Sequence, residues 1–477
     1  VGINNEKYWN KRGVKFYNKN KVTGVFWDYF TQDGALFERF GDLYQEYKKE
    51  PAVGIGSAFT PALFVTNPQN VQYILQGDFS SFYHRGIDTN KDDQLADNIL
   101  FMNGPRWKLM RQNMTPLFTS SKLKNMYYIM DKSAQDLVEY LKDNPKSWNG
   151  NCFETLMTFC NAAVCGAIFG ISSESVFDSP FLNMATSITK PTLINNLKFS
   201  LINISPKLSQ FLGIKLFKEY EEFLIPAIKN VIQVREKENV KRHDFADICI
   251  QIQKNGIMKD ATTGTELEPT YGLLAAQAMF FLIAGVEPVA IVVFYTLVEL
   301  GNHPDILEKV HREIDEKFEE HGKAITYDVI SEMSYIDKVL SEAMRKNPPI
   351  GYLTRQCVKD TVLPVGNIKI EKGTKMFTPI YHLQNDPEFY PDPEVFDPER
   401  FAKDNKQNDE FYMPFGMGGR TCIGARYSKL QMAAGIVHIL RHFTIKTKKL
   451  DVPVKFKRHF NIVRRVDVDI EFIPRNI

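Results

Sequence analysis

The sequence FGMGGRTCIG, from Phe415 to Gly424, places a cysteine in a setting that suits a reactive thiolate. A lone cysteine is most often a small buried hydrophobic residue, so Cys422 has to be judged by its neighbours. Glycines at positions 416, 418, 419 and 424 allow the backbone to turn tightly and to approach a flat ligand. Backbone N–H groups and the start of the following helix favour the thiolate, and Arg420 adds a planar cation that suits a carboxylate.

Several uses of a thiolate can be compared. Zinc and iron–sulfur sites need several cysteines at short spacing, and the six cysteines of this chain contain no C-x-x-C pair. A cysteine protease needs a partnered histidine, and nothing specifies one, since His438 and His442 lie in the predicted downstream helix. One thiolate, one arginine and room for a planar ligand indicate haem.

The loop also matches the pattern F-x-x-G-x-R-x-C-x-G in full, and it resembles the haem-binding loop of the cytochrome P-450 family. Further signatures occur in that family's order. Glu342 and Arg345 match its E-x-x-R, PEVFDPERF supplies Arg400, and WKLMR supplies Trp107 and Arg111. FSSFYHRG, PLFTSSKLKNM and DFADICIQIQ are most similar to its microsomal, insect-type branch.

The resemblance implies haem b as cofactor and assigns roles to residues of this chain. Cys422 is expected to be the axial ligand of the haem iron, in a loop that includes Phe415, Gly416 and Gly424. The haem propionates are expected to contact Arg420, Trp107, Arg111, Arg355 and Arg85. Glu342, Arg345 and Arg400 are expected to form a structural triad, in which loss of one partner leaves a buried charge unpaired.

The electrons are expected to come from another protein, because the chain has no G-x-G-x-x-G dinucleotide fingerprint. The resemblance implies an NADPH-dependent flavin reductase, with cytochrome b5 as an additional candidate. Lys108, Lys122, Arg426 and Lys429 are candidates for a basic docking face on the cysteine side of the haem.

The run from Tyr271 to Leu300 is long enough to span a bilayer, but Gln277, Glu287 and Pro288 near its middle favour a buried central helix. The family's central helix reads A/G-G-x-D/E-T over the haem. Ala284, Gly285 and Glu287 fit this pattern, whereas Pro288 replaces the threonine whose hydroxyl helps to deliver protons. Proline also leaves the Ala284 carbonyl without its helical donor.

Two enzymatic interpretations follow. The protein is expected to be a monooxygenase that inserts one oxygen atom from O2 into a small apolar or weakly polar substrate, with Glu287, water or the substrate supplying protons. The alternative is dehydration of an aldoxime to a nitrile, followed or not by hydroxylation, which depends less on that relay. A haem-binding sensor or carrier is a remote third possibility.

The elements that position these residues predict an α+β fold that is predominantly α-helical. The resemblance implies one triangular domain over residues 1–477. Strand-like pieces occur at AVGIGSAFTPALFVT, at TVLPVGNIKI and in the last thirty residues, and SKLKNMYYIMDKSAQDLVEYLK and HPDILEKVHREIDEKFEEH have helical periodicity. The formal net charge of +2 argues against a nucleic-acid partner.

The native protein is expected on the cytosolic face of the endoplasmic reticulum, held by an N-terminal anchor that the numbered chain lacks. The apolar but interrupted stretch 182–217 predicts a core-packed or solvated helix pair, or else a surface that touches the membrane or roofs the pocket. Substrate contacts are expected from residues 88–104, 194–211, 278–287 and 350–354, where apolar and aromatic groups dominate.

Overall fold

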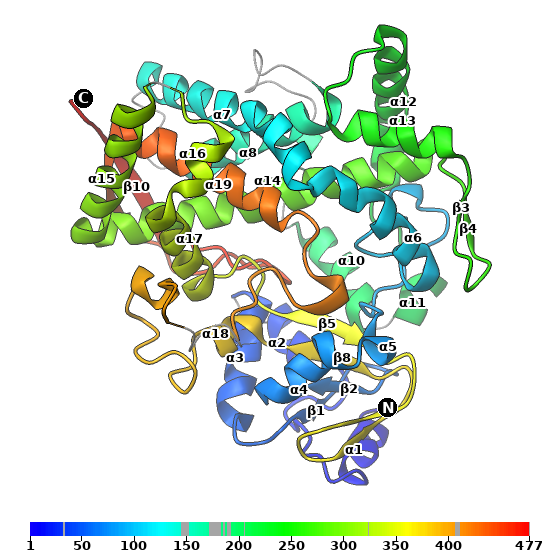
Figure 1. The fold of residues 1–477 in the computed structure, drawn as a ribbon. Coiled ribbons are helices and arrows are strands. Elements are labelled where there is room, and N and C mark those ends of the chain that lie inside the picture. The colour runs from blue at the N-terminus through cyan, green and yellow to red at the C-terminus, as the bar shows by residue number, and fades with distance from the viewer. Residues whose placement is uncertain are drawn as a thin grey trace.

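The computed structural model describes residues 1–31, 34–144, 152–170, 183–184, 187, 192–204, 206–322, 324–405 and 411–476. The described α-helices are α1 (Gly2–Asn10), α2 (Val25–Thr31), α3 (Leu36–Tyr47), α4 (Pro68–Gln72), α5 (Phe79–Phe82), α6 (Gly104–Met114), α7 (Ser120–Asp143), α8 (Cys152–Phe169), α10 (Leu193–Ile204), α11 (Pro206–Phe211), α12 (Glu221–Glu238), α13 (Phe245–Asn255), α14 (Tyr271–Asn302), α15 (Pro304–His321), α16 (Tyr327–Glu332), α17 (Ser334–Lys346), α18 (Ile380–Gln384) and α19 (Ala425–His442). Figure 1 shows long helices such as α7, α8, α14 and α19 in the upper part of the molecule, and the largest sheet below them beside α2 to α5.

The described strands form four small sheets. They are β1 (Val53–Ile55), β2 (Ala62–Phe64), β3 (Met258–Lys259), β4 (Glu266–Leu267), β5 (Leu353–Gln356), β6 (Thr361–Leu363), β7 (Ile368–Ile370), β8 (Lys375–Thr378), β9 (Phe443–Lys449) and β10 (Val468–Pro474). The largest sheet has the order β1-β2-β8-β5, in which β2 and β8 run parallel and the other neighbours antiparallel. It holds Arg355 on the strand β5. The α+β, predominantly helical prediction is therefore confirmed.

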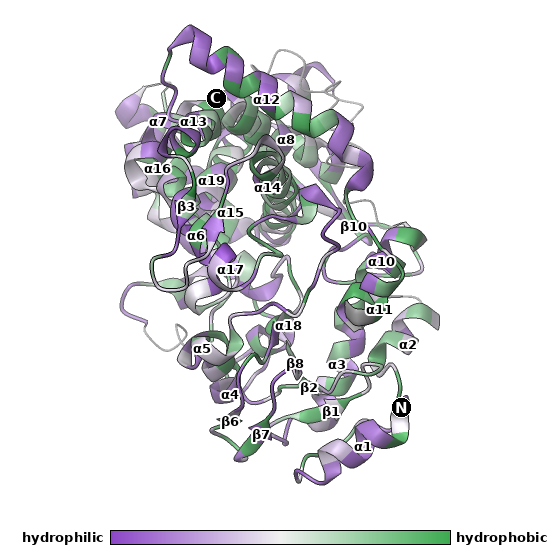
Figure 2. Ribbon diagram, turned by 90° about the vertical axis from the view of Figure 1, so that its right-hand side faces the viewer, coloured by the Kyte–Doolittle hydropathy of each residue, from purple (hydrophilic) through white to green (hydrophobic). Residues whose placement is uncertain are grey.

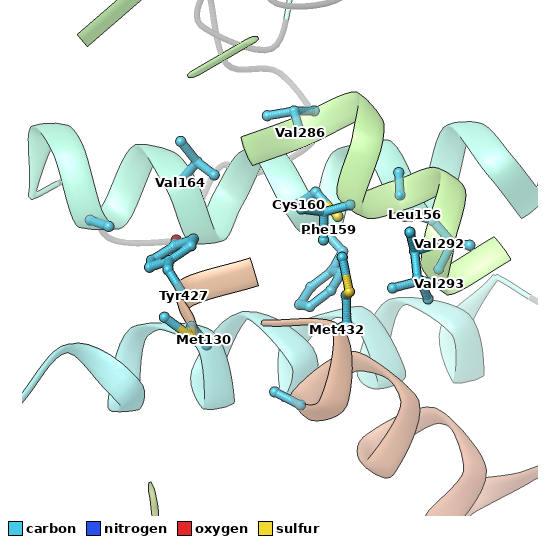
Figure 3. Packing of buried hydrophobic residues seen from close by; sticks show 14 of the residues in the cluster. Met130, Leu156, Phe159, Cys160, Val164, Val286, Val292, Val293, Tyr427 and Met432 are labelled. Atoms are coloured by element: carbon cyan, nitrogen blue, oxygen red, sulfur yellow. The ribbon is translucent and has the colours of Figure 1, made fainter. Parts of the chain in front are cut away.

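The central helix α14 is buried among other helices rather than exposed along its length. It packs against α8 and α19 through apolar side chains that include Val286, Val292 and Val293 from α14 and Met432 from α19 (Figure 3). By length and composition, α14 and α8 are the described helices able to cross a membrane, but 78% of the apolar window of α14 is buried inside the protein. The prediction of a central core helix is confirmed.

Helix α14 continues through its internal proline. Thr270 caps its start, with the side chain accepting a hydrogen bond from the Leu273 N–H at 3.2 Å. Pro288 lies inside the helix without ending it. Because proline has no N–H, it cannot donate to the Ala284 carbonyl one turn earlier.

The helix pair predicted within residues 182–217 is present as α10 and α11. Most of the segment before Leu193 lies outside the described residues. Figure 2 shows α10 and α11 on the same side of the molecule as α1 and α2. Exposed apolar side chains occur on both pairs, among them Ile194, Phe211 and Trp27.

The other predicted elements also match. The two helical sequences form α7 and α15, and the three strand-like pieces contain β1 with β2, β6 with β7, and β10. One buried link was not predicted. The Lys375 ammonium on β8 donates to the Gly86 carbonyl at 2.9 Å and to both the backbone and side-chain oxygens of Asn203, so it ties the sheet to α10.

Candidate active site

A cavity of about 420 Å³ lies between α14, the loop that precedes α19, and the roof helix α10. Its wall brings together residues that are far apart in the sequence, and it is mainly apolar. The site residues predicted from the sequence that line it are Arg85, Trp107, Arg111, Ala284, Gly285, Glu287, Pro288, Arg355, Phe415, Gly416, Arg420, Cys422 and Gly424. The expected substrate-contact segments also line it, with Ile99, Phe199, Phe280 and Ile350 among their members.

The cysteine loop is shaped by backbone that only glycine adopts easily. Gly416 and Gly418 have φ values of +73° and +68°. A Cβ on Gly418 would lie 2.3 Å from the Leu75 carbonyl oxygen. Gly424 differs from expectation, because it has φ −94° and a Cβ there would be 3.7 Å from Phe118. The tight turn therefore comes from the first two glycines, and Gly424 serves as the N-cap residue of α19.

Cys422 faces the cavity from a fixed backbone. Its N–H donates to the Phe415 carbonyl at 2.8 Å, and its side chain is accessible from the cavity inside the protein, in contrast to the buried thiols elsewhere in the chain. Burial within the protein raises the pKa of the thiol, while the Gly424 N–H, Arg111 and Arg85 act in the opposite direction. Coordination to a metal ion deprotonates a thiol, so a bound iron would act in the same direction as these three groups and would yield the thiolate.

Arg420 is held rigidly beside the loop. It is 2% exposed, and its guanidinium donates to the carbonyls of Tyr83 at 2.9 Å and Met102 at 2.7 Å. The same guanidinium lies 4.1 Å from the centre of the Trp107 ring. These contacts orient a cation that has a carboxylate-binding shape but no carboxylate partner among the described residues.

Three further arginines join Arg420 around the cavity. Burial lowers the pKa of Arg85 to about 10 and that of Arg355 to about 9, and it also lowers that of Arg111. Arg420 falls to about 8, because burial is joined by repulsion from the other three. Arginine stays protonated in proteins, so the lowered pKa values indicate buried positive charges that an anionic ligand would stabilise.

These features fit haem. The Nε atoms of Arg85 and Arg355 are buried without a partner in the described part of the chain, which is the type of donor that a propionate carboxylate would satisfy. The apolar wall suits a porphyrin face, and Cys422 provides a sulfur on one side of that wall. No group of three or more His, Cys, Asp and Glu side chains able to hold a metal ion occurs among the described residues.

The three residues expected to form a scaffold come together away from the cavity wall. Arg345 makes a bidentate pair with Glu342, with N–O distances of 2.9 and 2.8 Å, and both side chains are fully buried. Arg400 Nε lies 3.5 Å from the same carboxylate. Burial raises the pKa of Glu342, although Arg345 and Arg400 oppose the shift.

The central helix presents its unusual sequence to the cavity. Glu287, which is 6% exposed, and Pro288 both line it. Gly285 lines it as well, but a Cβ there would lie 2.7 Å from a methyl group of Val164 on α8. The absence of a side chain at Gly285 thus permits close packing of two helices.

The sequence did not point to the C-terminal loop, although His459, Phe460, Asn461 and Ile462 line the cavity. The loop reaches the site because the Gly351 N–H donates to the Asn461 carbonyl at 3.0 Å, and Phe460 stacks on Phe199. No motif or periodicity marks this loop in the sequence. Asn196 on α10 was within an expected segment but was not singled out.

Comparison with known proteins decides the family. The family model described as cytochrome P-450 matches residues 22–467. The chain belongs to the cytochrome P-450 family. It is 32% identical over 468 residues to probable cytochrome P-450 6a13 of Drosophila melanogaster, which spans 95% of this chain and 92% of the relative.

Two other insect relatives agree. Cytochrome P-450 6j1 of Blattella germanica is 32% identical over 93% of this chain and 88% of its own, and cytochrome P-450 6A1 of Musca domestica is 31% identical over 94% and 90%. The protein is therefore an insect-type P-450, a haem-dependent monooxygenase whose electrons come from NADPH through a reductase.

Proposed function

We propose that this P-450 inserts one oxygen atom into a small apolar or weakly polar substrate held between α14 and α10. The observation that carries the proposal is the convergence of Cys422, aromatic side chains and four arginines on one cavity, where no described carboxylate pairs with these arginines. When bound, haem supplies the oxygen chemistry of the family. Cys422 would ligate its iron, and Arg85, Arg111, Arg355 and Arg420, with Trp107, would bind its propionates.

The protein's own contribution to proton supply would differ from the family pattern. Pro288 offers neither the hydroxyl nor an N–H at the position of the usual threonine. The Ala284 carbonyl, free of its helical donor, can accept a hydrogen bond from a water or a substrate hydroxyl. Glu287 is the ionisable group of α14 that lines the cavity, so it is the candidate to hold or move a proton.

The reaction can be tested with the purified, haem-loaded protein, a reductase and NADPH. Compounds that perturb the haem spectrum are incubated under 18O2, and products are analysed by mass spectrometry. We expect one labelled oxygen atom per product molecule. Turnover without incorporation of label would exclude the proposal.

The second candidate function is dehydration of an aldoxime to a nitrile. Pro288 in the cavity wall favours it, because this reaction depends less on a hydroxyl-based proton relay. An aldoxime series tested in the same assay separates the two. Nitrile that forms without net oxygen consumption supports the dehydratase, and a labelled alcohol after the nitrile supports the two reactions in sequence.

The surroundings of the site extend the proposal. The chain would fold as one domain over residues 1–477, on the cytosolic face of the endoplasmic reticulum. The exposed apolar side chains of α10, α11 and the N-terminal helices, such as Ile194, Phe211 and Trp27, would contact the membrane. Flotation with neutral lipid vesicles tests this contact, which Phe211→Ser should weaken.

The reductase, with cytochrome b5 as a further candidate, would dock on the cysteine side. The basic face expected there is partly neutralised, because Lys108 pairs with Asp260 at 3.2 Å and Lys429 with Asp337 at 2.9 Å. Arg426 is exposed and donates a hydrogen bond to the Ser120 hydroxyl at 3.3 Å. Arg426→Glu should therefore weaken reductase-supported turnover more than Lys108→Glu.

A further inference from the structure

The imidazole of His459 is fixed in one tautomer at the cavity wall. Its Nδ1 accepts hydrogen bonds from the backbone N–H groups of Asn461 at 3.1 Å and Ile462 at 2.9 Å. A neutral ring that accepts at Nδ1 carries its proton on Nε2. Burial, with Lys457 and Arg464 nearby, lowers the pKa of His459 to about 3, so the ring stays neutral at physiological pH.

The Nε2–H donor has no hydrogen-bond partner among the described residues. The side chain is 8% exposed, and it lines the cavity. The Nε2 atom is not among the fully buried polar atoms, so it is accessible from the cavity, where a ligand atom can accept a hydrogen bond from it.

Asn196 provides a second polar group in the wall of the same cavity. It is 6% exposed, lines the same cavity, and its side-chain amide likewise has no partner in the described part of the chain. Phe199, one turn further along α10, stacks on Phe460 with ring centres 4.6 Å apart, and Phe460 packs against the His459 ring at 4.6 Å. His459 therefore adjoins this aromatic pair, and Asn196 lies one turn from Phe199 on the helix that supplies one of its rings.

We propose that His459 and Asn196 form a polar subsite that binds an uncharged oxygen acceptor, such as a ketone or ester carbonyl, on an otherwise apolar substrate. The inference rests on the proposed function and names the substrate class for the same site. The lining residues that carry positive charge are the four arginines assigned to the haem propionates. A carboxylate substrate would therefore find no free cation among the described lining residues, whereas a carbonyl oxygen finds two neutral donors.

The subsite can be tested by binding alone, without NADPH. Methyl nonyl ketone and the alkene in which a methylidene group replaces its oxygen differ only in the acceptor atom. Their affinities for the haem-loaded protein are measured by spectral titration and by calorimetry. We expect the ketone to bind about tenfold more tightly than the alkene, as one or two hydrogen bonds in a mainly apolar cavity would give.

Two variants assign the preference to these residues. His459→Asn withdraws the donor from the position of Nε2, because its amide N–H group sits on a shorter side chain, and keeps an oxygen able to accept from the Asn461 and Ile462 N–H groups. Asn196→Leu replaces the amide by an apolar group of similar size. Each should reduce the preference for the ketone at least threefold. His442→Asn, at a histidine outside the cavity wall, is the matched control and should retain it.

Equal binding of ketone and alkene by the unmodified protein would overturn the subsite, as would a full preference in both variants. Failure of the proposed function is recognised separately. If the protein prefers the ketone but forms no oxygenated product, the subsite is supported and the proposed oxygenation is not. If the protein oxygenates both compounds but binds them equally well, the oxygenation is supported and the subsite is not.

Discussion

The Arg420 guanidinium lies over the Trp107 indole, 4.1 Å from the ring centre, and so links the cysteine loop to α6. The two residues are more than three hundred positions apart in the sequence. The contact fixes the direction of the Arg420 donors, and it places Arg111, one turn beyond Trp107 on α6, beside the same loop through a 2.8 Å hydrogen bond to the Thr421 carbonyl.

Arg420→Gln should release haem more rapidly. The variant loses the cation and the rigid fork that donates to Tyr83 and Met102. We expect transfer of haem to a scavenging apoprotein to be at least tenfold faster, because a charged hydrogen-bond donor contributes about 1.5–3 kcal/mol. Arg426→Gln, on the exposed start of α19, is the control, and equal transfer rates in both variants would contradict the assignment.

Cys422→Ala should abolish the thiolate-type spectrum. The CO complex of the reduced protein is expected to lack the red-shifted band, while apoprotein stability changes little because the side chain is exposed to the cavity. Cys357→Ala, which removes a buried thiol outside the cavity wall, controls for loss of a cysteine. A red-shifted band in Cys422→Ala would exclude this residue as the axial ligand.

Pro288→Thr should increase the fraction of NADPH electrons that appear in oxygenated product severalfold. The change restores the hydroxyl of the family's proton relay, and it also restores a backbone N–H that can donate to the Ala284 carbonyl. Pro288→Ala restores only the N–H, so it separates the two effects. Product formed per NADPH consumed is the measurement. If Pro288→Thr instead loses all activity while haem content holds, the proline serves a specialised reaction such as oxime dehydration.

His382 should make the fold sensitive to mild acid. Burial lowers its pKa to about 4, although its hydrogen bond to the Phe37 carbonyl at 2.8 Å opposes the shift. The unfolded state binds a proton below about pH 6.5 and the native state does not, so stability falls as pH falls. Between pH 6.5 and 5 this residue should cost about 2 kcal/mol of unfolding free energy.

His382→Gln isolates that contribution, because the glutamine amide can still donate to Phe37 but does not titrate. Urea unfolding at pH 7.5 and pH 5 should show a smaller loss for the variant than for the unmodified protein. The same loss in both would show that His382 is protonated equally in the folded and unfolded states.

The sequence predicted the parts of the site that have a short motif. Cys422, Glu342 with Arg345, and Trp107 with Arg111 are each marked by residues at fixed spacing, and helix periodicity located α7 and α15. The role of Gly285 was less visible, because its steric neighbour Val164 belongs to another helix. Lys375 was missed for the same reason, since the Gly86 carbonyl that it contacts is remote in the sequence. His459 was missed because its partners are backbone N–H groups two and three residues further on, which no side-chain motif marks.

The walls of the cavity have a consequence for biosynthesis. Arg85, Trp107 and Arg111 come from the first quarter of the chain, whereas Arg420, Cys422 and His459 come from its final sixth. Nearly the whole polypeptide must therefore be synthesised before the residues that would hold the haem can come together. Such long-range closure is slow, and the early segment, which carries two of the four cavity arginines, Arg85 and Arg111, must wait as a partly folded intermediate. Haem supply at that moment, rather than during elongation, would set the yield of active protein.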